Sequence, residues 1–177
     1  MKKVMIVDDN ILSVEGIVKN IDWSSLNAIV THVAYNGESA IELMKKEHVD
    51  LIITDIEMPD IDGISMSSIA LTINPLVRVI LISAYDKFEY AKRAIRLGVC
   101  DYIEKPIDYQ YLSDKIKNAF LSIEREINTK ALLEQSRPIM TEKFFTDLLT
   151  FSGSDASIHL HPYAKFLNLN LEYNFYN

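Results

Sequence analysis

Acidic residues stand directly after two short apolar runs of this sequence. Asp8 and Asp9 follow the run 3–7, and Asp55 follows the run 51–54. Short apolar runs of this kind are typical of buried parallel strands, whose carboxyl ends meet at one edge of a sheet. Carboxylates that meet there repel one another unless a cation lies between them, and oxygen ligands in an open polar crevice suit Mg²⁺. The sequence therefore predicts a magnesium site built from these aspartates.

Two further polar residues follow later apolar runs. Ser83 comes directly after the run 77–82, and Lys105 comes shortly after the run 99–103. A metal ion, an ammonium group and a hydroxyl around a carboxylate suit the transfer of a phosphoryl group, whose charge is spread over three equatorial oxygens. In such a site the nucleophile would be an aspartate, which forms an acyl phosphate.

The elements that must position these residues alternate along the first part of the chain. Apolar runs typical of strands are separated by stretches in which apolar residues recur at three- and four-residue spacing, as in amphipathic helices. The predicted strands are 3–7, 29–35, 51–54, 77–82 and 99–103, and the predicted helices are 11–21, 38–47, 63–73, 86–97 and a last one from Asp108. This alternation predicts an α/β fold, a doubly wound five-stranded parallel sheet with helices on both faces.

The motifs at the predicted strand ends resemble those of response-regulator receiver domains, the phosphoacceptor domains of two-component systems. They occur in the order of that family over about residues 1–122, and together they are far more specific than any one of them alone. The motifs are Val7-Asp8-Asp9, Thr54 to Gly63, Ser83-Ala84-Tyr85 and Asp101 to Pro106. The resemblance implies a flavodoxin-like sheet of strand order 2-1-3-4-5, with a helical extension after it.

The resemblance also implies roles for the acidic residues. Asp55 would accept the phosphoryl group from a sensor histidine kinase. Asp9 would ligate Mg²⁺ directly, Asp8 would help through a water molecule, and the backbone carbonyl of Glu57 would be a further ligand.

For the other motif residues, the resemblance implies pairing and switching. Lys105 would pair with the phosphoryl group, and its bond to Pro106 would be a cis peptide bond, which proline permits. On phosphorylation the hydroxyl of Ser83 would move toward the new oxygens, and the ring of Tyr102 would fill the space that it leaves. Ala84 would leave room for the phosphoryl group.

The expected organisation of the chain has three parts. Residues 1–122 form the receiver domain, and residues 123–137 form a helical linker that continues the last receiver helix and ends before Pro138. Residues 138–177 begin a connecting domain that the sequence does not complete. The apolar spacing along 108–135 is compatible with a homodimer through this helix or with packing of the helix on its own domain.

The segment 83–99 resembles the receivers of YesN-like regulators, whose output is an AraC-type pair of helix-turn-helix units. The resemblance implies control of transcription, with DNA bound only through a C-terminal domain that is absent from this chain.

The composition argues against several other classes of protein. Of the 177 residues, 49% are hydrophobic and 24% are charged, which is the balance of a globular protein rather than a disordered one. The net charge of −7 lacks the basic excess that a DNA-binding surface needs. No apolar stretch approaches the roughly 20 residues of a membrane span, and the single cysteine cannot form an internal disulfide. We therefore expect a cytoplasmic protein.

Two alternative functions are compatible with the acidic motifs. A stand-alone receiver would act by docking on a protein partner without binding DNA. A haloacid-dehalogenase-like phosphatase also uses a nucleophilic aspartate and Mg²⁺, but its acidic pair is expected in a D-x-D arrangement, whereas Asp8 and Asp9 are adjacent.

Overall fold

The structure is a computed structural model that describes residues 1–84, 101–150 and 163. The chain divides into two compact units, Met1–Glu124 and Arg125–Asn177. The predicted helix 86–97 and the apolar alternation 169–175 lie outside the described residues. The predicted domain boundaries stay a prediction.

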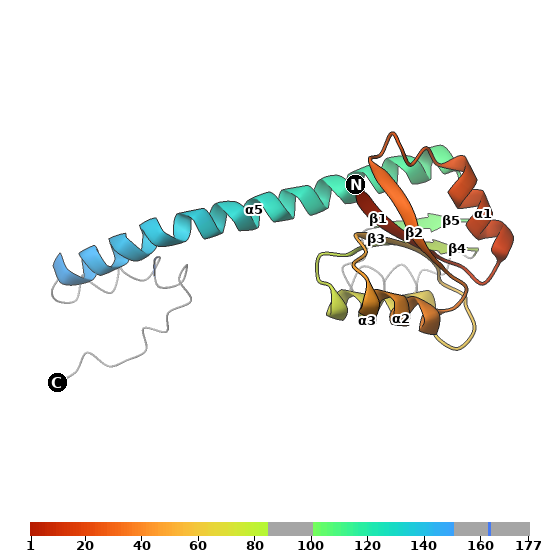
Figure 1. The fold of residues 1–177 in the computed structure, drawn as a ribbon, viewed down its shortest axis with the longest axis horizontal. Helices are drawn as coiled ribbons and strands as arrows, with labels where there is room; N and C mark the ends of the chain where they lie inside the picture. The colour runs from red at the N-terminus through yellow and green to blue at the C-terminus, as the bar shows by residue number, and fades with distance from the viewer. Residues whose placement is uncertain (85–100, 151–162, 164–177) are drawn as a thin grey trace. The chain divides into compact units, whose positions relative to one another are not determined.

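The first unit is built on a five-stranded parallel sheet, as the sequence pattern predicts, and its order is β2-β1-β3-β4-β5, as the resemblance implies (Figure 1). Most of the residues that pair across β1, β3 and β4 are apolar and buried, because helices cover both faces of the sheet. The strands are β1 (Lys2–Val7), β2 (Ala28–Ala34), β3 (Leu51–Asp55), β4 (Arg78–Ser83) and β5 (Asp101–Glu104).

The helices of the first unit cover both faces of this sheet. The described helices are α1 (Ile11–Asn20), α2 (Gly37–Lys46), α3 (Gly63–Ile73) and α5 (Tyr109–Thr150). One apolar cluster joins α2 and α3 to alternate residues of β1, β3 and β4, and a second cluster joins α1 and the first part of α5 to the opposite face. These two layers bring the carboxyl ends of β1, β3, β4 and β5 to one edge.

Side-chain caps fix where two helices begin next to that edge. Asn10 accepts a hydrogen bond from the backbone N–H of Leu12 at the start of α1. Asp62 accepts one from the N–H of Ser65 at the start of α3. Because each cap satisfies an N–H that has no partner within its helix, the connections after β1 and β3 end at defined positions.

The helix α5 extends further than the sequence predicted. The interpretation that the helix ends before Pro138 was wrong, because α5 continues through Pro138 to Thr150. A proline inside a helix removes one hydrogen bond, but the leucine, glutamate, methionine and lysine residues around it favour helix strongly. No helix in the part of the chain that the structure describes, α5 included, is long and apolar enough to cross a membrane.

Candidate functional site

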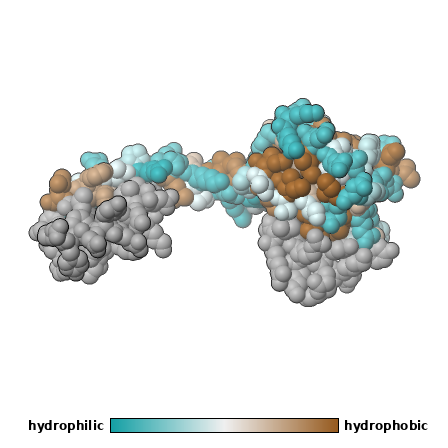
Figure 2. Space-filling model, turned by 90° about the horizontal axis from the view of Figure 1, so that it is seen from below, coloured by the Kyte–Doolittle hydropathy of each residue, from teal (hydrophilic) through white to brown (hydrophobic). Residues whose placement is uncertain are grey.

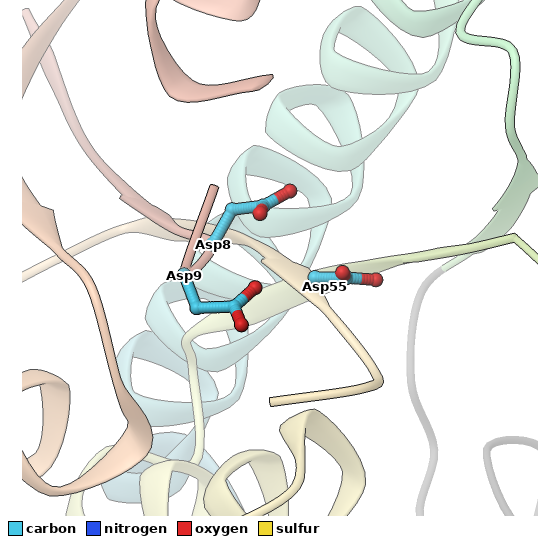
Figure 3. Close-up of side chains that lie close together, drawn as sticks. All are labelled: Asp8, Asp9 and Asp55. Atoms are coloured by element: carbon cyan, nitrogen blue, oxygen red, sulfur yellow. The ribbon is translucent and has the colours of Figure 1, made fainter. Parts of the chain in front are cut away.

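Three aspartates lie together at the carboxyl ends of β1 and β3. The two strands are neighbours, with Val7 opposite Thr54, so Asp8 and Asp55 follow side by side. One carboxylate oxygen each of Asp8, Asp9 and Asp55 lies within 4.8 Å of the other two, and the side chains extend in the same general direction (Figure 3). Asp8 and Asp55 are buried, with 1% and 7% of their surface exposed, whereas Asp9 is exposed.

The ammonium group of Lys105 faces two of these carboxylates. Its Nζ lies 2.9 Å from Oδ2 of Asp55 and 3.2 Å from Oδ2 of Asp8. The backbone of Lys105 is held at the same edge, because its N–H donates to the carbonyl of Ser83 at 2.8 Å. The bond from Lys105 to Pro106 is a cis peptide bond.

The remaining oxygens of the two buried carboxylates accept backbone hydrogen bonds. Oδ1 of Asp8 accepts from the N–H of Asn10 at 2.8 Å, and Oδ1 of Asp55 accepts from the N–H of Ile56 at 2.8 Å. Both side chains are therefore fixed by backbone groups as well as by the ammonium of Lys105.

The pKa shifts of Asp55 and Lys105 indicate that the single ammonium of Lys105 does not fully compensate the buried carboxylates. Burial raises the pKa of Asp55, and the neighbouring charge of Asp8 adds to this, while the hydrogen bond and charge of Lys105 offset only part of the effect. Burial opposes the charge of Lys105, but the hydrogen bond that its ammonium donates to Asp55 and the charges of both aspartates outweigh burial and raise the pKa of Lys105. The site therefore favours additional positive charge.

The donor chemistry of the site fits a hard divalent cation. Its side-chain ligand atoms are carboxylate oxygens. Asp8 and Asp55 are buried, whereas Asp9 is exposed to solvent. Mg²⁺ prefers oxygen ligands and keeps several of its waters, so an acidic cluster that is open on one side suits it.

The other predicted site residues lie at or near the same edge. Ser83 is fully buried at the end of β4, one position beyond the residue that pairs with Asp55. Tyr102 lies in β5 opposite Leu81, partly buried, and packs against the apolar cluster on the side of α2 and α3. Glu57 is exposed, two residues after Asp55.

Sequence reasoning assigned no role to Gly63, which the structure places against Asp55. A Cβ on Gly63 would collide with the backbone carbonyl of Asp55, so only glycine lets α3 begin this close to β3. The N–H of Gly63 donates to the carbonyl of Ile56 at 2.9 Å. The signals in the sequence were the position of this glycine directly after the cap residue Asp62 and at the end of the motif from Thr54 to Gly63.

Comparison with protein families gives one match that covers most of the chain. The model of the family described as "Response regulator receiver domain" matches residues 4–117. This range contains the aspartate cluster and Lys105.

Individual proteins resemble the same part of the chain. The chain is 31% identical over 126 residues to the uncharacterized transcriptional regulatory protein YesN of Bacillus subtilis, a match that covers 71% of this chain and 34% of YesN. Thus the matched part spans about a third of that relative.

Two solved structures also match, each covering 71% of this chain and 97% of the other, with a TM-score of 0.66. One is the REC domain of AraT, a response regulator from Geobacillus stearothermophilus, at 39% identity. The other is a two component transcriptional regulator AraC from Clostridium phytofermentans, at 32% identity.

Proposed function

Because this chain belongs to the response regulator receiver domain family, we propose that Asp55 is the residue on which it accepts a phosphoryl group from a sensor histidine kinase. The observation that carries the proposal is the placement of the Asp55 carboxylate, 2.9 Å from the ammonium of Lys105 and in a cluster with Asp8 and Asp9. A carboxylate in this setting can act as a nucleophile toward phosphorus, and the ammonium of Lys105 beside it can stabilise the negative charge of the transferred group.

The transfer exchanges one bond to phosphorus for another. A carboxylate oxygen of Asp55 forms a bond to the phosphorus, and the bond from phosphorus to the imidazole nitrogen of the donor histidine breaks. The electron pair of that bond leaves on the nitrogen. Lys105, which pairs with Asp55 before the transfer, then pairs with the phosphoryl oxygens, so its charge stabilises the group as it arrives.

A divalent cation completes this site. We assign its binding to the carboxylates of Asp8, Asp9 and Asp55 together with the backbone carbonyl of Glu57. Bound Mg²⁺ supplies positive charge that offsets the carboxylates and the phosphoryl oxygens. Support comes from the all-oxygen side-chain donor set and from the raised pKa of Asp55, which indicates incomplete charge compensation by Lys105.

Ser83 and Tyr102 are proposed to couple phosphorylation of Asp55 to a change at the surface of the domain. The hydroxyl of Ser83 moves toward the phosphoryl oxygens, and the ring of Tyr102 takes the space beside it, while Ala84 leaves room for the group. The burial of Ser83 at the end of β4 and the packing of Tyr102 in the neighbouring strand support this pairing. The phosphoryl group thereby shifts an equilibrium between two conformations.

As a receiver domain of a response regulator, the chain is a regulatory protein. Hydrolysis of its own acyl phosphate belongs to the same proposal. Water attacks the phosphorus, the bond to the Asp55 oxygen breaks, and inorganic phosphate leaves with the carboxylate restored.

The proposed output is control of transcription through an AraC-type DNA-binding domain elsewhere in the full regulator. Support comes from YesN and the Clostridium phytofermentans protein, which are both described as transcriptional regulators.

A homodimer through α5 is proposed as the link to that output. The helix packs on its own domain as far as Ile123, which is 2% exposed. Beyond it, Ile127, Leu132 and Ile139 are 45%, 64% and 68% exposed, and hydrophobic and hydrophilic residues both appear along this stretch (Figure 2). Exposed apolar residues on a helix favour association with a second helix.

The proposed function is tested by phosphorylation of the purified chain. Incubation with Mg²⁺ and acetyl phosphate is expected to add the mass of one phosphoryl group, and peptide mapping is expected to place it on Asp55. The Asp55→Asn variant, which keeps the shape and lacks the nucleophile, should gain nothing. Modification of another residue, or equal modification of Asp55→Asn, would refute the assignment.

A further inference from the structure

A fully buried hydroxyl group lies near the end of β3, directly before Asp55. Thr54 is fully buried in β3, after the apolar residues Leu51, Ile52 and Ile53. A buried hydroxyl costs free energy unless it forms a hydrogen bond, and valine has nearly the same shape and an equal preference for strands. The fold alone therefore gives no reason for threonine at this position.

The hydroxyl of Thr54 bonds to the residue that carries the proposed chemistry. Its Oγ1 donates to the backbone carbonyl of Asp55 at 2.9 Å, and both groups are buried. The same carbonyl faces Gly63, where even a Cβ has no room. The carbonyl is thus fixed by a hydrogen bond and by the close approach of α3.

The orientation of that carbonyl controls the orientation of the Asp55 side chain. The carbonyl of Asp55 and the N–H of Ile56 belong to one planar peptide unit and cannot rotate separately. This N–H donates to Oδ1 of Asp55 at 2.8 Å and to the carbonyl of Ile82 at 2.9 Å. A rotation of the peptide plane would break the bond to Oδ1 and change the direction in which the carboxylate points.

We propose that Thr54 is a positioning residue for phosphoryl acceptance, whose hydroxyl fixes the peptide plane between Asp55 and Ile56 and so directs the Asp55 carboxylate. This inference rests on the proposed function of Asp55. Nucleophiles that shift from their productive geometry lose rate steeply, so one neutral hydrogen bond that maintains the geometry is worth about tenfold in rate.

The test compares Thr54→Val, which keeps the shape and lacks the hydroxyl, with Thr54→Ser, which keeps the hydroxyl and lacks the methyl group. For each full chain we would measure the Tm and the initial rate of Asp55 phosphorylation at one concentration of acetyl phosphate and Mg²⁺. We expect Thr54→Val to stay folded and to react about tenfold more slowly, and Thr54→Ser to have a lower Tm than the wild type and to react at nearly the wild-type rate.

The opposite order of rates would overturn the inference, because a residue that only packs the core would tolerate valine better than serine. A wild-type rate in Thr54→Val would overturn it too, as would failure of Thr54→Val to fold, since the hydroxyl would then serve the fold. The proposed function fails separately, through absence of phosphorylation at Asp55 in the wild-type chain.

Discussion

The ammonium nitrogen of Lys105 lies 2.9 Å from Oδ2 of Asp55, and the same ammonium lies 3.2 Å from Oδ2 of Asp8. Two carboxylates that are almost completely buried therefore share one positive charge. Burial, with a smaller contribution from the charge of Asp8, leaves the pKa of Asp55 raised, although the hydrogen bond and charge of Lys105 lower it.

The first prediction concerns the stability of the Asp55→Asn variant. Because the pKa of Asp55 is raised above its ordinary value of 3.8, the stability that its protonated form contributes is fully present below pH 3.8. It is lost as the pH rises through the raised value. At pH 7, without divalent cations, we expect Asp55→Asn to have a higher Tm than the wild type, because the amide carries no charge to bury.

The measurement is thermal unfolding followed by circular dichroism at pH 7 and again below pH 3.8. The gain in Tm of Asp55→Asn over the wild type should shrink at the lower pH, where Asp55 of the wild type is protonated in both the folded and the unfolded state. Asp60→Asn, an exposed change in the loop after β3, serves as the control and should leave the Tm unchanged. A lower Tm for Asp55→Asn at pH 7 would contradict the prediction.

The second prediction concerns divalent cations. Mg²⁺ binds the folded site and not the unfolded chain, so a concentration of 100 times the Kd should stabilise the protein by about 2.7 kcal/mol. Asp9→Asn should reduce this increment without lowering stability in a chelator, because Asp9 is exposed.

Denaturant titrations with Mg²⁺ and with a chelator measure both quantities. The control is Glu15→Gln, an exposed carboxylate on α1 that pairs with Lys19 and takes no part in the aspartate cluster. If Glu15→Gln reduced the Mg²⁺ increment as much as Asp9→Asn, the site would be wrongly assigned.

The third prediction separates two glycines. In Gly63→Ala the new Cβ meets the backbone of Asp55, which cannot move aside, so we expect a loss of about 1–3 kcal/mol in the free energy of unfolding. In Gly16→Ala the new Cβ meets only the hydroxyl end of the Tyr109 side chain, which can move.

Alanine also favours the interior of α1 over glycine by roughly 0.5–1 kcal/mol, so Gly16→Ala should change stability little. Urea unfolding of both variants gives the comparison. Equal effects at the two positions would show that the approach of α3 to Asp55 is not tight.

The fourth prediction tests where α5 is attached to the first unit. Ile116 is fully buried, so Ile116→Ala should cost about 2–5 kcal/mol. Leu132 is 64% exposed, so Leu132→Ala should stay within about 0.5 kcal/mol of the wild type in monomer stability.

Denaturant unfolding at low protein concentration measures the stability of both variants. Light scattering at high concentration measures whether Leu132→Ala still forms the proposed dimer. A large loss of monomer stability in Leu132→Ala would mean that this part of α5 is packed within its own chain.

The sheet could be predicted from the sequence because parallel strands covered on both faces are continuous apolar runs. Leu51 to Ile53 and Val79 to Ile82 are such runs, and the structure buries all of their side chains. The clustering of Asp8 and Asp55 follows from the same reasoning, since strand ends of a parallel sheet share one edge. The roles assigned to these residues stay predictions until they are tested.

Other features depend on contacts that no local pattern reveals. The need for glycine at position 63 depends on how closely α3 approaches β3, and the partner of the Thr54 hydroxyl depends on the local backbone conformation at the end of β3. Pro138 was interpreted as a helix end from its local cost alone, whereas α5 tolerates it within a run of strong helix formers.

The partners of Lys105 come from distant points of the chain, 50 residues earlier for Asp55 and 97 residues earlier for Asp8. A ribosome-bound chain that has not yet reached Lys105 lacks the ammonium, and a chain in which β5 has come away from the sheet loses it again. Phosphoryl acceptance at Asp55, as proposed, therefore requires the complete and assembled sheet, because only then does the ammonium of Lys105 lie beside both carboxylates.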